Sequence, residues 1–202
     1  MDSLLAIFPL DVVLFPSAPL PLHIFEPRYK EMIGECIAAK SSFGVVRSQG
    51  ETLAEVGCTA EILEVTKQYD DGRLDILTQG RQRFELVGLN QERAFLQAEV
   101  TYFDDEPGTT DRQDVERALR LYHEVLEVAG VEAPSPMPGA GELSFQLVAP
   151  LPLDLDFKQT LLGMRSEPQR VSAVIEYYQA LLPRMRRSVR VRKVAGGNGH
   201  AL

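Results

Sequence analysis

The side chains that most often carry out catalysis or bind metals are few in this sequence and lie far apart. Of the three histidines, His123 lies on the polar side of a predicted helix, His200 lies near the C-terminus, and only His23 lies within an apolar stretch. A zinc site needs three or four donors, so one isolated histidine does not predict a metal site. We therefore expect no metal, and we favour a structural, hydrogen-bonded role for His23 over a catalytic one.

The two cysteines, Cys36 and Cys58, do not form a C-x-x-C pair, and no secretory leader pattern precedes them. Cys36 falls on the apolar face of a predicted helix, and Cys58 lies near the start of a predicted strand. This usage is typical of reduced, buried thiols in a cytoplasmic protein.

Nucleotide-binding motifs are also missing, because no segment fits the phosphate-binding pattern G-x-x-x-x-G-K-[ST]. The G-A-G run at Gly139–Gly141 follows prolines rather than a predicted strand, which indicates a flexible loop and not a dinucleotide-binding turn. No nucleophile and base can be paired from the sequence either. These observations predict a protein that is not an enzyme and has no cofactor.

The richest segment is the apolar stretch Ile7–Tyr29, which five prolines interrupt. Proline fixes φ and lacks a backbone donor, so the stretch cannot be one long strand or helix. We expect a short strand over Asp11–Phe15, a loop over Pro16–Pro21, an extended piece over Leu22–Phe25 and a helix that begins at Pro27. Proline suits the first helical position, where its missing N–H would be unpaired in any case.

Apolar side chains in such a loop are either packed in the core or bind a partner. Core packing is the simpler interpretation for each one taken alone. Taken together, the loop and the adjoining helix start are a candidate peptide-binding surface, and its residues are Phe15, Leu20, Leu22, His23 and Tyr29.

Glu26, Pro27 and Arg28 form a compact polar motif at the helix start. A carboxylate there is favoured by the exposed N–H groups and the helix dipole, and Arg28 could pin the helix to a neighbouring strand. The alternative is that these charges anchor the backbone of a bound peptide. We favour the structural role for this motif.

In the rest of the chain the sequence pattern changes once, from short strands to amphipathic helices, near residue 104. Short strands with turn signals, including a two-residue turn at Asp71-Gly72, fill the region up to Phe103. Amphipathic helices follow an acidic connection that begins at Asp104. We expect a β-barrel-like subdomain over residues 1–104, a helical subdomain over 105–188 and a flexible basic tail over 189–202.

Charge is distributed unevenly along the chain. The net charge is −8, but residues 184–202 contain six basic residues and no acid, so residues 1–183 carry 15 basic against 29 acidic groups, a balance of −14. Phosphate repulsion makes nucleic acid an unlikely partner of such an acidic body. A solvated tail is the simpler interpretation of the basic end, and an acidic partner, RNA or an anionic surface is the alternative.

The segment LFPSAPLPLHIFEPRY, Leu14–Tyr29, resembles the opening of the Lon amino-terminal domain family. DGRLDILTQGRQRFEL (Asp71–Leu86) is similar to the central hairpin of that family, FLQAEV (Phe95–Val100) to its next strand, and Leu143–Ile175 to its helical part. The resemblance covers roughly residues 5 to 182. Gly163-Met164 departs from it, since a larger residue and an acid are expected there.

The resemblance implies an α+β fold, with a PUA-like β-barrel module that carries one helix and is followed by a helical subdomain. It implies a non-catalytic protein- or peptide-binding module like the substrate-recognition domain of ATP-dependent Lon protease, in a stand-alone, bacterial-type member without the ATPase and protease domains. Its partners would be unfolded or tagged protein segments, with no membrane. The alternatives are a small-molecule- or RNA-binding PUA-like barrel, or a regulatory subunit that docks on a separate protease.

Overall fold

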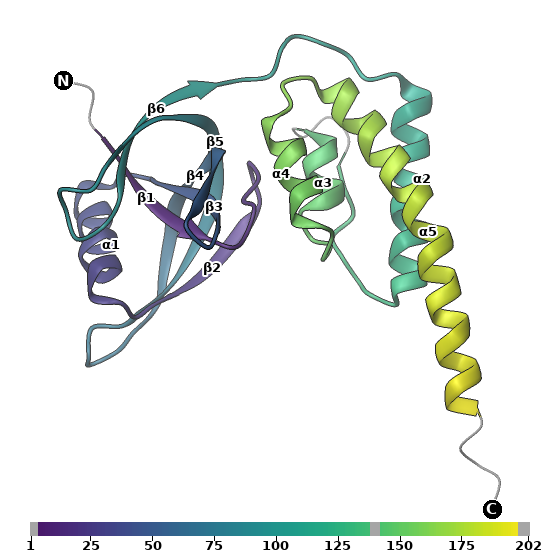
Figure 1. Ribbon diagram of the computed structural model, residues 1–202, viewed down its shortest axis with the longest axis horizontal. Helices are drawn as coiled ribbons and strands as arrows, with labels where there is room; N and C mark the ends of the chain where they lie inside the picture. The colour runs from purple at the N-terminus through teal and green to yellow at the C-terminus, as the bar shows by residue number, and fades with distance from the viewer. Residues whose placement is uncertain (1–3, 138–141, 198–202) are drawn as a thin grey trace, which may run out of the picture. The chain divides into compact units, whose positions relative to one another are not determined.

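The structure is a computed structural model that describes residues 4–137 and 142–197, and side chains up to residue 188 (Figure 1). It divides into two compact units, one made of Met1–Asp105 with Leu153–Gly163 and the other of Glu106–Pro152 with Met164–Leu202. The first unit is mostly strands and the second is helical, so the expected α+β class is confirmed.

The first unit is built on one six-stranded sheet whose pairings close on themselves. Its strands are β1 (Leu5–Leu10), β2 (Pro19–Ile24), β3 (Phe43–Gln49), β4 (Thr52–Gln68), β5 (Leu74–Asn90) and β6 (Gln97–Phe103). The strand order is β2-β5-β4-β3-β1-β6, and β6 also pairs with β5. Five strands therefore form a ring of pairings, while β2 pairs with the outer part of the long strand β5.

The first strand lies earlier than the sequence predicts. Residues 11–15 contain no strand, whereas β1 pairs in parallel with β3 and in antiparallel fashion with β6. The chain must then turn to reach β2, and the N–H of Ser17 donates to the carbonyl of Gly80 at 2.8 Å within that turn. The expected strand at Asp11–Phe15 is wrong because this long-range pairing, which a short sequence window does not contain, decides where β1 lies.

Helix α1 (Pro27–Ala39) begins where the sequence predicts, with Pro27 in its first turn. Its buried face consists of Tyr29, Met32, Ile33 and Cys36. A separate buried cluster of the sheet unites Ile7, Val46, Phe84 and Ala98 from four strands. The start of α1 is held beside β1 by the stacked rings of Tyr29 and Phe8.

Helix α4 (Leu155–Gly163) belongs to the first unit, which corrects the expected boundaries at residues 104 and 105. Arg47 Nη1 donates to Asp156 Oδ1 at 2.6 Å, and Arg83 Nη1 donates to the carbonyl of Leu162 at 3.0 Å. Both arginine side chains are buried and have little contact with water, so each needs a hydrogen-bond acceptor from the protein. These polar contacts hold α4 against β3 and β5, although α4 follows these strands by many residues in the sequence.

The second unit contains α2 (Arg112–Ala129), α3 (Leu143–Val148) and α5 (Glu167–Gly197), and Figure 1 shows α2 and α5 side by side. Its most buried charge is Arg170, which is 0% exposed and donates to Glu167 Oε2 at 2.7 Å. The same guanidinium donates to Ser144 Oγ at 3.0 Å and lies over the ring of Phe145. This paired arginine links α3 to α5.

Helix α5 extends further than the sequence predicts. It passes through Pro183 and continues to Gly197, so residues 189–197 of the expected flexible tail are helical. Pro183 removes the helical N–H partner of the Gln179 carbonyl, and both residues are exposed. Residues 198–202 of the expected tail, and the Gly139–Gly141 loop, lie outside the described residues.

Candidate functional site

A small apolar pocket lies where β1, β2 and the start of α1 meet. Its volume is about 270 Å³. It is lined by residues that come from these elements and from the short connection between β2 and α1, namely Phe8, Leu10, Leu22, His23, Ile24, Phe25, Glu26 and Tyr29. The only ionisable side chains in this set belong to His23, Glu26 and Tyr29, so the pocket is suited to an apolar group.

The rings of Phe8 and Tyr29 stack with their centroids 4.0 Å apart. The guanidinium of Arg28 lies over the Tyr29 ring, 4.5 Å from its centroid. Burial raises the pKa of the Tyr29 phenol, and this effect exceeds the opposite one of the Arg28 charge. Tyr29 is therefore neutral at pH 7 and presents an aromatic wall.

Phe25 is the exposed apolar residue of the set. Its side chain is 58% exposed, although its immediate neighbour Ile24 is buried. The ring of His23 stacks on it with the centroids 5.9 Å apart. An aromatic ring held beside an apolar pocket yet open to solvent gains the most when a partner covers it.

His23 is held in place by a polar network on the hairpin between β4 and β5. Its Nδ1 lies 2.5 Å from Asp75 Oδ1, and the hydroxyl of Tyr69 donates to Asp75 Oδ2 at 2.9 Å. The bond from His23 and then the bond from Tyr69 lower the pKa of Asp75. Asp75 therefore joins His23 and Tyr69 and fixes the orientation of the imidazole.

The polar motif at the helix start is self-contained. Glu26 is the N-cap residue of α1, but its side chain makes no capping bond. Its carboxylate instead accepts from Arg28 Nε at 2.9 Å. Glu26 thus lies at the helix start, where a carboxylate is expected, but its side chain bonds to Arg28 and not to a backbone N–H of α1.

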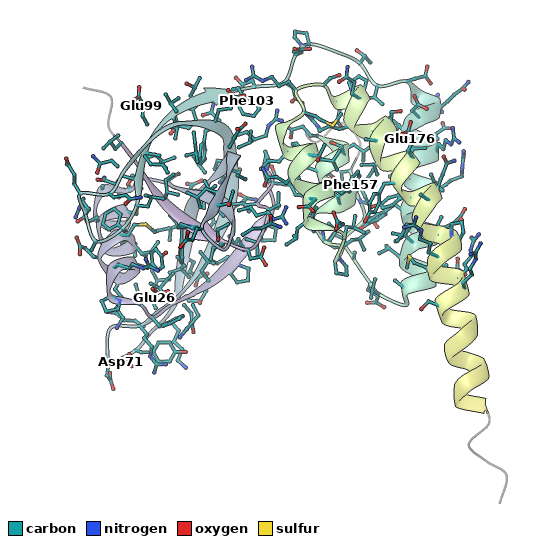
Figure 2. The ribbon with its side chains drawn as sticks, viewed as in Figure 1. Glu26, Asp71, Glu99, Phe103, Phe157 and Glu176 are labelled. Atoms are coloured by element: carbon teal, nitrogen blue, oxygen red, sulfur yellow. The ribbon has the colours of Figure 1, made fainter. Side chains whose placement is uncertain are left out.

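The helix start is tied to the β4–β5 hairpin through another residue. Lys30 Nζ donates to the carbonyl of Asp71 at 2.9 Å, and Figure 2 shows Glu26 and Asp71 at the same end of the first unit. The chain turns at Asp71-Gly72 as expected, with Gly72 at φ 79°, but the loop is one residue longer than predicted, because the N–H of Tyr69 donates to the carbonyl of Arg73 at 3.0 Å. The hairpin thus supports both His23 and α1.

Three of the five predicted peptide-binding residues come together in the pocket: Leu22, His23 and Tyr29. Phe15 is 1% exposed and lies in the core, and Leu20 is half-buried on β2 opposite Thr78. Neither of these two lines the pocket.

Sequence reasoning missed Phe8, Leu10 and Phe25. Phe8 and Leu10 lie on β1, so they could be recognised only once that strand had been placed. Phe25 was visible as a large aromatic residue directly before a helix start, and that position is the signal that could have identified it.

The described residues contain neither a metal-binding cluster nor a helix that could span a membrane. Within residues 4–137 and 142–197, no group of three or more histidine, cysteine, aspartate or glutamate side chains could hold a metal ion. In the same ranges no helix has the length and apolar character needed to cross a bilayer.

The model of the family described as the ATP-dependent protease La (LON) substrate-binding domain matches residues 5–180. The Lon protease of Parabacteroides distasonis is 34% identical over 112 residues, which cover 51% of this chain and 14% of that protein. Lon protease 1 of Hydrogenovibrio crunogenus is 25% identical over 182 residues, which cover 82% of this chain and 22% of the relative. The chain therefore spans about a fifth or less of the length of these curated relatives.

Solved structures share the fold. A Lon N-terminal domain protein from Xanthomonas campestris has a TM-score of 0.70 at 23% identity, covering 87% of this chain and 98% of that one. The N-terminal domain of a Mycobacterium avium complex Lon protease has a TM-score of 0.61 at 16% identity, with coverage of 88% and 98%.

Proposed function

Because the chain belongs to the LON substrate-binding domain family, we propose that its pocket binds one bulky apolar side chain of an extended protein segment. The observation that carries this proposal is the exposed ring of Phe25 beside a pocket with aromatic walls. Unfolded or tagged protein segments are the proposed clients, since they expose the apolar side chains that folded proteins bury.

The size of the pocket supports a side chain as its occupant. A volume of about 270 Å³ lies at the lower end of the range of roughly 300–1,000 Å³ that is typical of small-molecule and cofactor sites. One aromatic or large aliphatic side chain can enter it while the rest of the segment stays outside. This favours peptide binding over the small-molecule alternative.

Preorganisation supports the same proposal. Pro19 and Pro21 restrict β2, the Asp75 carboxylate fixes His23, and the stacked ring of Phe8 supports Tyr29. A site held in this way loses little conformational entropy on binding. Affinity would then rest on a few apolar contacts, as in interfaces dominated by hot spots.

The chain acts, in this proposal, as a cytoplasmic recognition module that does not itself cut its clients. It would either hold them or present them to a separate protease. Casein incubated with the purified protein should stay intact, and cleavage retained through stringent repurification would contradict this part of the proposal.

The binding proposal is tested with Phe25→Ser, using reduced and carboxymethylated α-lactalbumin as a permanently unfolded client. We expect the variant to keep its melting temperature, because the ring is mostly exposed, and to bind about 5- to 30-fold more weakly, which corresponds to ~1–2 kcal/mol. Leu89→Ser is the matched control, because Leu89 is 50% exposed and does not line the pocket. Equal affinity of Phe25→Ser and the control would remove the pocket from the client site.

A further inference from the structure

The outer part of strand β4 has a free edge. Strand β3 pairs with β4 only as far as Ala60, where Phe43 is the partner. From Glu61 to Gln68, β4 pairs with β5 on one side alone. Within residues 4–137 and 142–197, no other strand pairs with that second side.

The direction of the backbone groups follows from the register. Gly80 exchanges hydrogen bonds with Ser17 and Ala18, so its N–H and C=O point away from β4. Directions alternate along a strand, so the next residue of β5, Gln79, turns its backbone groups toward β4, as do Leu77 and Asp75.

The β4 partners of these three residues are Glu61, Glu64 and Lys67. The backbone N–H and C=O groups of these three β4 residues therefore point toward β5. Ile62 and Val65 lie between them in the sequence, and their backbone groups point toward the unpaired side of β4.

The outer part of β5 lies between the outer part of β4 and β2, so β2 forms the opposite edge of this region. The residues of β2 protect that edge. On β2, Leu20 and Leu22 pair with residues of β5 whose backbone groups face β2. Pro19 and Pro21 therefore occupy the outward positions, where a proline offers no N–H. Prolines on an edge strand prevent another strand from adding to it. The outer edge of β4 has no proline, so one edge is protected and the other is open.

A groove lined by both apolar and charged side chains runs along the open edge, and its charged residues are Lys40, Glu61 and Glu64. Its volume is about 350 Å³, and its two walls are the C-terminal turn of α1 and residues 61–65 of β4. Ile37 on the first wall is 40% exposed, and Leu63 and Val65 on the second are 49% and 38% exposed. The groove thus offers backbone hydrogen bonds and apolar side-chain contacts together.

We propose that the outer edge of β4 is a second docking site, which binds an extended, uncharged or basic polypeptide segment as an added strand. Only an extended backbone can pair with the outward groups of Ile62 and Val65 in ladder geometry. The register shifts of β4 at Ile62/Glu64 and Val65/Lys67 limit the pairing to a short segment.

Charge argues against a second copy of the chain as the occupant. Residues 1–183 carry a balance of −14, so two copies repel each other. Glu61 is bonded to Arg81, while Glu64 is exposed and makes no ion pair within the described residues. An added strand with a basic residue would complement Glu64.

The experiment uses a short fluorescent peptide that alternates valine with threonine and ends in lysine, and a copy of it that is N-methylated at alternate residues. Both have the same side chains, but the copy lacks the backbone donors that pair with an edge. We expect the copy to bind at least about fivefold more weakly, as the loss of one backbone hydrogen bond would cause. Equal binding of the two peptides, or no binding of the unmodified one, would overturn the proposal.

Hydrogen exchange locates the peptide. The amides of Ile62 and Val65 should gain protection when it binds, whereas that of Glu64, which already faces β5, should change little. Val65→Pro and Leu63→Lys should each weaken binding, and Leu89→Lys serves as the matched control on another face.

Phe25→Ser distinguishes this site from the pocket. It should leave binding of the short peptide unchanged, and the edge site stands even if the pocket fails its own test. Loss of peptide binding in Phe25→Ser but not in Val65→Pro would assign the peptide to the pocket and overturn the edge site. A concentration-dependent dimer in sedimentation, abolished by Val65→Pro, would assign the edge to a second copy instead.

Discussion

Leu20 and Leu22 lie two residues apart on β2, and both are half-buried, yet only Leu22 lines the pocket. Truncating each leucine in turn therefore shows whether clients contact the pocket alone or a longer part of the strand. We expect Leu22→Ala to weaken binding of the unfolded client by about 5- to 30-fold and Leu20→Ala to leave it unchanged. Anisotropy titrations with the same client measure both. Equal losses in the two variants would extend the site along β2.

Asp75 gives a pH-dependent prediction. Its pKa is lowered from 3.8, first by His23 and then by Tyr69. A depressed folded pKa means that the carboxylate stabilises the fold above the unfolded pKa, and that this stabilisation is lost as pH falls through the folded value. Carboxyl NMR titration should therefore place Asp75 below 3.8, and His23→Gln should raise its midpoint.

Asp71 is the internal control for this titration. Its pKa is lowered mainly by the backbone N–H of Arg73, which His23→Gln does not alter. The midpoint of Asp71 should stay in place in the variant. An Asp75 midpoint that also stays in place would show that the bond to His23 does not form in solution.

At the scale of single elements, α1 and α2 end in the same left-handed conformation with different residues. Lys40 caps α1 at φ 50°, and Gly130 caps α2 at φ 66°. A side chain in this conformation costs about 1–2 kcal/mol, and glycine avoids that cost. Lys40→Gly should therefore stabilise the first unit by about 1 kcal/mol, while Gly130→Ala should destabilise the second by a similar amount. Urea denaturation measures both, and a destabilised Lys40→Gly would contradict the argument.

The contrast between α1 and β1 shows what the sequence could predict. The start of α1 follows from one local feature, Pro27, together with an apolar face spaced for a helix. Strand β1 depends on partners that are distant in the sequence, Gly44 to Arg47 on β3 and Ala98 on β6. No local pattern encodes those pairings, and β1 contains a proline at Pro9 that argues against a strand when it is considered alone.

The same distinction explains how much of the pocket was predicted. Leu22, His23 and Tyr29 lie in one segment with a recognisable motif, so they were found together. Phe8 lies on β1, which the sequence alone predicts at the wrong residues. The sequence also predicts Phe15 in the binding surface, but Phe15 lies in the core, just before the turn at Ser17. The motif identified the region, and the tertiary pairing decided which of its side chains are accessible.

At the scale of the whole molecule, the first unit is discontinuous in sequence. Residues 1–105 supply the sheet and α1, and residues 153–163 return to supply α4. Leu161 and Leu162 of α4 are buried, and Asp156 and the carbonyl of Leu162 accept from Arg47 and Arg83. A fragment that ends at residue 105 loses these partners and also loses the apolar contacts of Leu161 and Leu162.

We therefore expect the fragment 1–105 to aggregate or to unfold without cooperativity. Replacing residues 106–152 with a long glycine-serine linker, and ending the chain at Gly163, should restore one cooperative urea transition, because this chain holds the whole first unit. In that chain Asp156→Asn should lower the transition midpoint, since it leaves Arg47 with a neutral partner. Arg81→Ser in the same chain is the matched control, because Arg81 forms an exposed ion pair with Glu61 and should change stability little. A fragment 1–105 that is soluble and unfolds cooperatively would show that α4 is not needed to complete the first unit.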